Sequence, residues 1–271
     1  MGSADIIPGV SGGTIALITG IYQRLIEAIS SVFALINTGN IKNLIKLRFR
    51  EVWKTFCAID FALIVPLGIG ILSAFFALSN VIHFLMEDYT AITYAFFFGL
   101  ILASAYFLYR KIEGFRKSTY VSVILGFIAG FIIVGLETLK ASHSAPVIFF
   151  SGSIAITAMI LPGISGAFIL LLLNQYEHVV NIIRTLDFKG IATFGAGAFV
   201  GLMLFSKLLN YLLHNHKRKT MGFLIGLMLG SMRLQLMIIN REVLGNAEKI
   251  FVGLAVLAGF AVVYLLTRMK K

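Results

Sequence analysis

Pro8-Gly-Val-Ser-Gly-Gly-Thr-Ile15 reappears in the second half of the chain as Pro162-Gly-Ile-Ser-Gly-Ala-Phe-Ile169. Each copy interrupts an apolar stretch, 6–36 or 146–173. Proline lacks a backbone donor and clashes with the preceding helical turn, and glycine adopts conformations that end a helix. A single break would fit a kinked ordinary span equally well. Because the break occurs twice in matching surroundings, we expect two broken or re-entrant helices.

Further matches follow in the same order. Tyr22 stands at the same distance after Pro8 as Tyr176 does after Pro162. A second series of matches has a smaller offset and includes Asp60 with Asp187, Thr93 with Thr220, and the Gly-Leu pairs at 99 and 226. The smaller offset places an insertion in the first half, between Tyr22 and Asp60. The series predicts an internal duplication, with repeats over 1–140 and 141–271.

The composition points to a membrane protein. Of 271 residues, 59% are apolar and 13% charged, and the mean hydropathy is +0.94, which excludes an ordinary water-soluble enzyme. The single Cys57 rules out a disulfide framework, and no Cys/His spacing predicts a metal site. No basic stretch precedes the first apolar residues, so a cleavable signal peptide is not expected. Six apolar stretches are long enough to span a bilayer, at 59–83, 91–109, 119–136, 191–213, 220–239 and 250–267.

Lys and Arg predict the orientation. The formal net charge is +11, and the basic residues concentrate in 37–58, 110–118, 214–219 and the C-terminus, which marks these segments as cytoplasmic. Successive loops then lie on alternate sides of the membrane, provided that each Pro-Gly hairpin enters the membrane and returns to the side from which it entered. We therefore expect an all-α polytopic membrane protein with two inverted repeats, each a re-entrant hairpin plus three spans. The first hairpin has a short leading arm, from which we expect that the chain begins downstream of the natural N-terminus.

The two turns are candidate phosphate sites. Helices that begin after such turns direct unpaired N–H groups toward a ligand, and serine and threonine add hydroxyl donors. The residues expected to hold the phosphate are Ser11, Gly12, Gly13, Thr14, Ser165 and Gly166, with Arg233 as a cationic clamp. The alternatives are that the small residues serve helix packing and that Arg233 extends toward the membrane surface.

Acidic residues have separate expected roles. Asp5 is the acidic residue of the first turn and has no counterpart in the second repeat, where Met159 stands. We expect Asp5 to take part in ion coupling, with helix capping or pairing with an arginine as the alternative. Asp60 and Asp187 each precede an apolar helix, and N-capping explains both.

The insertion contains a basic amphipathic stretch. Lys42, Lys46, Arg50 and Lys54 recur at every fourth position beside an apolar stripe. This pattern predicts an interfacial helix at about 37–58 that binds anionic lipids. Nucleic-acid binding is the weaker interpretation, because no base-reading module accompanies the charges.

The stretch Gly2–Tyr22, the second copy at Leu161 and the Gly-Leu-x-Leu-x-Ser pieces at 99 and 226 resemble the signature of a bacterial membrane family, the PopT polyprenyl-phosphate translocases. The resemblance implies a multi-pass transporter of undecaprenyl phosphate in the bacterial inner membrane. The distribution of Lys and Arg places the C-terminus in the cytoplasm, and the residues themselves predict no cofactor and no nucleic-acid partner. It maps the family motif onto these residues of the first copy and of the repeat: Asp5, Pro8, Gly9, Ser11, Gly12, Gly13 and Thr14, and Pro162, Gly163, Ser165 and Gly166. A homo-oligomer is left open.

Two other functions remain. A membrane polyprenyl-pyrophosphate phosphatase also has inverted repeats and Pro-Gly-x-Ser turns, but its motif carries an arginine after the serine. Here Gly12 and Gly166 follow the serines, and no histidine adjoins them to serve as an acid or base. A secondary transporter for a small anion would use the same broken helices, and only the resemblance favours a lipid substrate.

Overall fold

The computed structural model describes residues 1–5, 10–34, 53, 56–112, 114, 116–139, 141–242 and 245–268, and all regular elements in these ranges are helices. The first part contains α1 (Gly2–Asp5), α2 (Gly12–Ile18), α3 (Tyr22–Ala34), α6 (Phe61–Asp88), α7 (Thr90–Lys111) and α8 (Lys117–Gly135). The second contains α9 (Ala145–Ile160), α10 (Gly166–Leu172), α11 (Tyr176–Arg184), α12 (Phe188–Asn215), α13 (Lys217–Ser231), α14 (Arg233–Glu242) and α15 (Asn246–Arg268).

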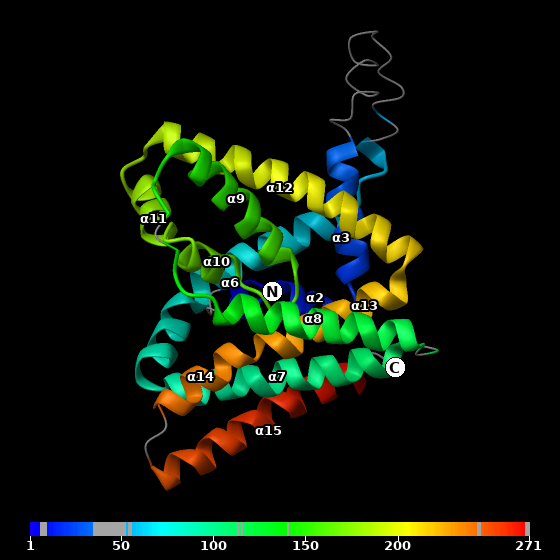
Figure 1. Cartoon of the computed structure of the whole chain (residues 1–271), viewed down its shortest axis with the longest axis vertical. Coiled ribbons are helices and arrows are strands. Elements are labelled where there is room, and N and C mark those ends of the chain that lie inside the picture. Colours follow the sequence, from blue (N-terminus) through cyan, green and yellow to red (C-terminus); the bar gives the residue numbers. More distant parts are fainter. Residues whose placement is uncertain are drawn as a thin grey trace.

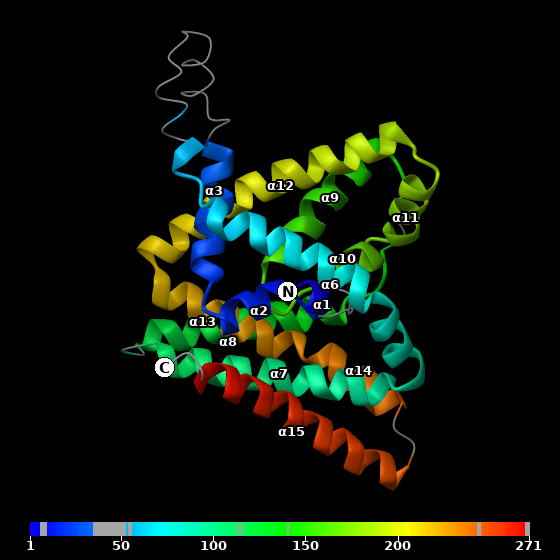
Figure 2. The ribbon, with the colours of Figure 1, turned by 180° about the vertical axis from the view of Figure 1, so that it is seen from behind.

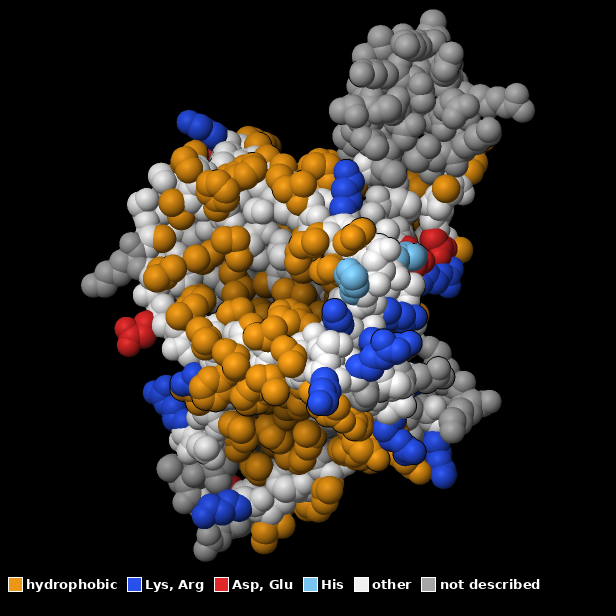
Figure 3. All heavy atoms as spheres, turned by 45° about the vertical axis from the view of Figure 1, so that its right-hand side comes forward, with side chains coloured by type: hydrophobic (Ala, Val, Ile, Leu, Met, Phe, Trp, Pro, Cys, Tyr) orange, Lys and Arg blue, Asp and Glu red, His pale blue; other side chains and the backbone are white. Residues whose placement is uncertain are grey.

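Six stretches are long and apolar enough to cross a membrane: Phe61–Leu78, Thr90–Lys111, Lys117–Gly135, Phe188–Asn215, Lys217–Glu242 and Glu248–Arg268. They coincide with the six spans expected from the sequence, so the prediction of a multi-pass helical membrane protein is confirmed. Only 6% of the residues in the α6 span are buried, and apolar side chains such as Ile69, Leu72 and Phe76 are exposed along it. Figure 3 shows apolar side chains over a broad area of one face, as expected for a surface that contacts lipid.

Two pairs of helices, α2 with α10 and α6 with α12, begin and end at corresponding residues of the two halves. The helices α6 and α12 both have 28 residues, and α2 and α10 both have seven. The Thr93 hydroxyl donates to the Leu85 carbonyl, and the Thr220 hydroxyl donates to the Leu212 carbonyl. Just before Tyr22 and Tyr176, Gly20 and Asn174 have φ angles of 70° and 54°. These are the residue pairs that the two sequence offsets match.

Close helix pairs form the bundle, and glycines permit the close approach. The helix α7 packs against α15, α8 against α13, and α9 against α12. A Cβ at Gly99 would overlap the Val256 carbonyl, and a Cβ at Gly226 would overlap the Val123 carbonyl. The two Gly-Leu pieces therefore serve helix packing. The short helices α1, α2 and α10 lie between α6, α9 and α12 on one side and α7 and α15 on the other (Figures 1 and 2).

The insertion contributes little to the described structure. Lys42, Lys46, Arg50 and Lys54, which the sequence assigns to anionic lipids, lie outside the described residues. The same holds for Pro8 and Gly9 of the first turn.

Candidate functional site

The two turns contact each other directly. The Ser11 hydroxyl lies 3.0 Å from the Leu161 carbonyl and 3.2 Å from the Met159 carbonyl. The Gly163 N–H donates to the Thr14 hydroxyl at 3.0 Å. Ser11 and Thr14 are buried, so these bonds lie inside the protein. Segments from opposite halves of the sequence thus form one polar centre.

In the first turn, groups of the chain itself bind the donors at the start of α2. The Gly12 N–H donates to the Asp5 carboxylate at 2.6 Å, and the Gly13 N–H donates to the Ser11 hydroxyl at 3.1 Å. The Thr14 N–H donates to the Ser11 carbonyl at 3.0 Å. Asp5 therefore caps this turn, which was the alternative role that the sequence left for it, and its carboxylate occupies the position of an anion there.

In the second turn, the donors at the start of α10 stay free. Ser165 is 5% exposed, and its side chain makes no capping bond at the start of α10. Within the described part of the chain, neither its hydroxyl nor the N–H groups of Gly166, Ala167 and Phe168 have a hydrogen-bond partner. The first N–H groups of any helix lack an intrahelical partner, and of these four residues only Ser165 is buried, whereas Gly166, Ala167 and Phe168 are partly exposed. The four adjacent donors are therefore open to a ligand.

A cavity of about 270 Å³ adjoins these donors. Ser165 and Gly166 line it together with Asp5 of the first turn and Tyr176 at the start of α11. The rest of its wall is largely apolar, from α9, α10 and α12, and includes Ala155, Met159, Leu170 and Phe194. The cavity therefore combines a small polar end with an apolar wall, as sites for amphiphilic ligands do.

Arg233 lies apart from this arrangement. Its guanidinium donates to the Phe131 carbonyl at 3.0 Å and lies 4.2 Å from the centre of the Phe131 ring. Both contacts are with α8, and its recorded contacts in the described structure include no residue of either turn. The structure thus brings together Ser11 to Thr14 with the Leu161–Gly166 segment and places the predicted clamp elsewhere.

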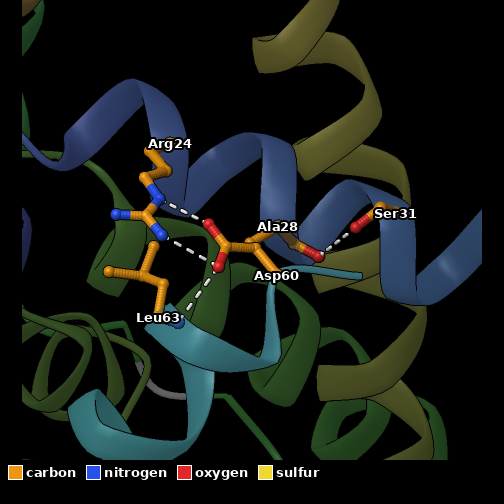
Figure 4. A network of polar contacts seen from close by, with 5 residues as sticks. All are labelled: Arg24, Ala28, Ser31, Asp60 and Leu63. Carbon is orange, nitrogen blue, oxygen red and sulfur yellow. Dashed lines mark hydrogen bonds and ion pairs between the residues drawn. The ribbon is translucent and has the colours of Figure 1, made fainter. Parts of the chain in front are cut away.

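Asp60 and Asp187 cap helices, as the sequence predicts. The Asp60 carboxylate accepts from the Leu63 N–H, and the Asp187 carboxylate accepts from the Lys189 N–H, each at 3.1 Å. Asp60 also forms a two-pronged ion pair with Arg24 of α3 (Figure 4). Hydrogen bonding to the Arg24 guanidinium holds the pKa of Asp60 below its ordinary value.

Sequence reasoning gave no role to the paired tyrosines. The Tyr22 hydroxyl donates to the Ile160 carbonyl at 3.3 Å, which ties α3 to the second turn, and Tyr176 lines the cavity beside Ser165. The sequence signal that could have indicated a role for these tyrosines is their identical spacing from Pro8 and Pro162.

Comparisons with known proteins agree with this picture of the chain. Residues 1–249 match the model of a family described as undecaprenyl phosphate translocase-like. The chain is 39% identical over 241 residues to a polyprenyl-phosphate transporter of Vibrio cholerae, covering 86% of this chain and 73% of the relative. It is 34% identical over 252 residues to a polyprenyl-phosphate transporter of Staphylococcus aureus, covering 86% and 81%. No solved structure matches significantly. This chain therefore belongs to the undecaprenyl phosphate translocase-like family.

Proposed function

We propose that this protein moves undecaprenyl phosphate across the bacterial cytoplasmic membrane, so that the lipid carrier of cell-envelope assembly is recycled. The observation that carries the proposal is the polar centre where the two turns meet within a bundle of apolar helices. A phosphate cannot cross hydrocarbon unaided, because an unpaired charge there is very costly. The two relatives, which are named polyprenyl-phosphate transporters, support the same class of substrate.

The second turn would hold the phosphate in this conformation. The Ser165 hydroxyl and the N–H groups of Gly166 and its two successors supply donors that can surround phosphate oxygens. The apolar wall of the adjoining cavity suits the first carbons of a prenyl chain, while the remaining tail stays in lipid. Gly12, Gly13 and Thr14 would serve the phosphate in another conformation, once Asp5 leaves the first turn. Arg233 would contribute only if its guanidinium left Phe131.

In the proposed mechanism, two inverted repeats, over 1–140 and 141–271, open the phosphate site to the two membrane faces in turn. Each repeat has a re-entrant hairpin and three spans. Support comes from the matched bounds of α6 and α12 and of α2 and α10. The bend of 108° between α10 and α11 supports a re-entrant second hairpin. The distribution of Lys and Arg favours a cytoplasmic C-terminus in the bacterial inner membrane. Anionic lipids would bind the 37–58 insertion.

Reconstitution in liposomes tests the function. Labelled undecaprenyl phosphate is added to one leaflet, and its transfer to the other leaflet is measured together with the release of free phosphate. Transfer of the lipid without release of phosphate is the expected result, because we propose a transporter that is not an enzyme. Release of phosphate would identify a phosphatase. Neither event, together with uptake of inorganic phosphate, would identify a small-anion transporter.

A further inference from the structure

A second cavity lies away from the turns, on the side of the molecule where α7 ends and α13 begins. It has a volume of about 420 Å³ and is lined by the cationic side chains of Lys111, Lys217 and Arg218. Tyr22 and Gln23 of α3 line the same cavity. We call this cavity, as defined by these five residues, the basic vestibule. Figure 3 shows Lys and Arg side chains gathered beside His on this side of the molecule.

The charges of the basic vestibule are not neutralised by the described residues. The ion pairs found in the described ranges join Arg24 with Asp60, His83 with Glu87, and His214 with Glu27. None involves Lys111, Lys217 or Arg218. The nearby Glu27 carboxylate accepts a hydrogen bond from Gln23 at 2.9 Å and faces His214 at 3.4 Å. The three cations are therefore available to an anionic ligand.

One helix N-terminus also adjoins this cavity, beside the last turns of α7 and α12, whose C-terminal ends carry the opposite partial charge, so the net positive charge comes from the three side chains. Lys217 and Arg218 are the first two residues of α13, a helix of 15 residues whose preceding residue, His216, makes no side-chain capping bond. The N-terminus of such a helix carries a partial positive charge and free N–H groups. The inner wall, in contrast, is apolar and includes the buried side chains of Leu17, Leu108 and Leu213.

The shape and charge of this cavity select the ligand. A phosphate monoester carries a charge of about −1.5 to −2 near neutral pH, whereas the phosphodiester of a common phospholipid carries one negative charge and bulky groups on both sides. Three cations at the rim and an apolar floor fit a dianionic head group followed by a hydrocarbon chain. Arg218 can bond two phosphate oxygens at once.

We propose that the basic vestibule binds the phosphate head group of polyprenyl phosphate on its way to or from the two turns, and this inference rests on the proposed transport function. The position supports the proposal, because Tyr22 connects the two places. Its ring lines the vestibule, and its hydroxyl donates to the Ile160 carbonyl beside the second turn. Tyr22 thus contacts both the vestibule and the backbone that precedes the second turn.

The test compares two triple variants with the same loss of charge. The vestibule variant carries Lys111→Gln, Lys217→Gln and Arg218→Gln. The control carries Arg110→Gln, Arg116→Gln and Lys219→Gln, which alter exposed cations of the same loops that do not line the cavity. Membrane abundance of both proteins is checked first. Binding of labelled farnesyl phosphate is then measured with purified protein in a neutral detergent, with unlabelled farnesyl phosphate, farnesol and phosphatidylglycerol as competitors.

We expect the vestibule variant to bind farnesyl phosphate at least about tenfold more weakly than wild type, and the control to stay within about twofold. In neutral liposomes the half-saturating fraction of undecaprenyl phosphate should rise by a similar factor in the vestibule variant alone. The maximal rate should be kept, because the turns are intact. Added salt should weaken binding to wild type more than to the vestibule variant.

Three results would overturn the proposal. Equal binding by the two variants would remove the vestibule as a site, even if transport by wild type were normal. Competition by phosphatidylglycerol as strong as that by farnesyl phosphate would assign the cavity to ordinary anionic lipids. Competition by farnesol as strong as that by farnesyl phosphate would show that the head group is not recognised. Conversely, a wild-type protein that binds through these residues and moves no lipid would support the vestibule and refute the transport function.

Discussion

The Thr14 hydroxyl accepts a hydrogen bond from the Gly163 N–H, so the first turn directly satisfies a backbone donor of the second. Gly163 has a φ of 88°, which a residue with a side chain rarely adopts. A Cβ there would also lie 2.6 Å from the Ser231 hydroxyl oxygen. The second turn is therefore held by α2 on one side and by the end of α13 on the other, while its Ser165 end faces the cavity.

The two serines should behave differently when replaced. Ser165→Ala removes one free donor from the proposed phosphate site, and we expect binding to weaken by about ten- to hundredfold, from a charge-assisted hydrogen bond of about 1.5–3 kcal/mol. Ser11→Ala removes the cap of α2 and a bond to the second turn, and should lower the stability by about 1 kcal/mol. Affinity for farnesyl phosphate and the thermal midpoint in detergent measure the two effects. Equal effects of both variants on affinity would contradict the assignment of the site to the second turn.

Asp5→Asn tests the role of the capping carboxylate. Asparagine keeps an oxygen that accepts from the Gly12 N–H, but it cannot lose or gain a proton. We expect the pH dependence of transport to change while membrane abundance stays near that of wild type. Asp187→Asn is the matched control, because Asp187 also caps a helix but lies at the start of α12. An Asp5→Asn protein with normal transport and an unchanged pH profile would reduce Asp5 to a helix cap.

The ion pair of Arg24 and Asp60 predicts a pH-dependent stability difference. The folded protein lowers the pKa of Asp60 from 3.8, so the pair stabilises the fold above that value and loses its effect as the pH falls through the lowered pKa. Arg24→Gln should therefore lower the thermal midpoint at pH 7 and have little effect at the acid limit. Since the Arg24 side chain is exposed and the Asp60 side chain is partly exposed, the difference should be small and should shrink in high salt.

A double-mutant cycle supplies the control for this pair. Asparagine is also a good N-cap, so Asp60→Asn removes the charge and keeps the bond to the Leu63 N–H. Arg24→Gln should add no further loss in the Asp60→Asn background. Additive losses would mean that the two side chains do not interact in solution.

Cysteine labelling tests the orientation. Cys57 is the one cysteine of the sequence, so single cysteines can be introduced in a Cys57→Ser background. We expect a cysteine at His216 to be protected from an impermeant reagent added to intact cells, and a cysteine at Tyr89 to react. Labelling of position 216 from outside would refute the inverted arrangement of the repeats.

The sequence predicts much of this fold because its signals are local. A run of about 20 apolar residues must form a helix in a bilayer, and aspartate before such a run finds free N–H groups one turn on, as Asp60 and Asp187 do. Self-similarity then predicts which elements correspond. These inferences need no knowledge of which helices touch.

The site depends on contacts that sequence spacing does not encode. Ser11 and Ser165 stand in nearly the same local sequence, yet one caps its helix and the other has no partner in the described structure. The difference arises because the first serine packs against the Met159–Leu161 backbone and Asp5 occupies the neighbouring donor. The contact of the Arg233 guanidinium with the Phe131 carbonyl and ring was also not predictable from the sequence, and its role as a phosphate clamp stays a prediction. The basic vestibule likewise combines cations from helix ends that are far apart in the sequence.

The glycine contacts between paired helices determine how the molecule can move. Where the backbone of one helix rests against a glycine of the next, as at Gly99 and Gly226, sliding along the axis would drive carbonyl oxygens into larger side chains. We therefore expect each pair, α7 with α15 and α8 with α13, to move as one rigid unit. Outside these pairs, the chain turns sharply at Gly20, between α2 and α3, and at Asn174, between α10 and α11, where the backbone is left-handed. We therefore expect a transport cycle to change the direction of the short helices at these two turns and to leave the interior of each glycine-packed pair unchanged.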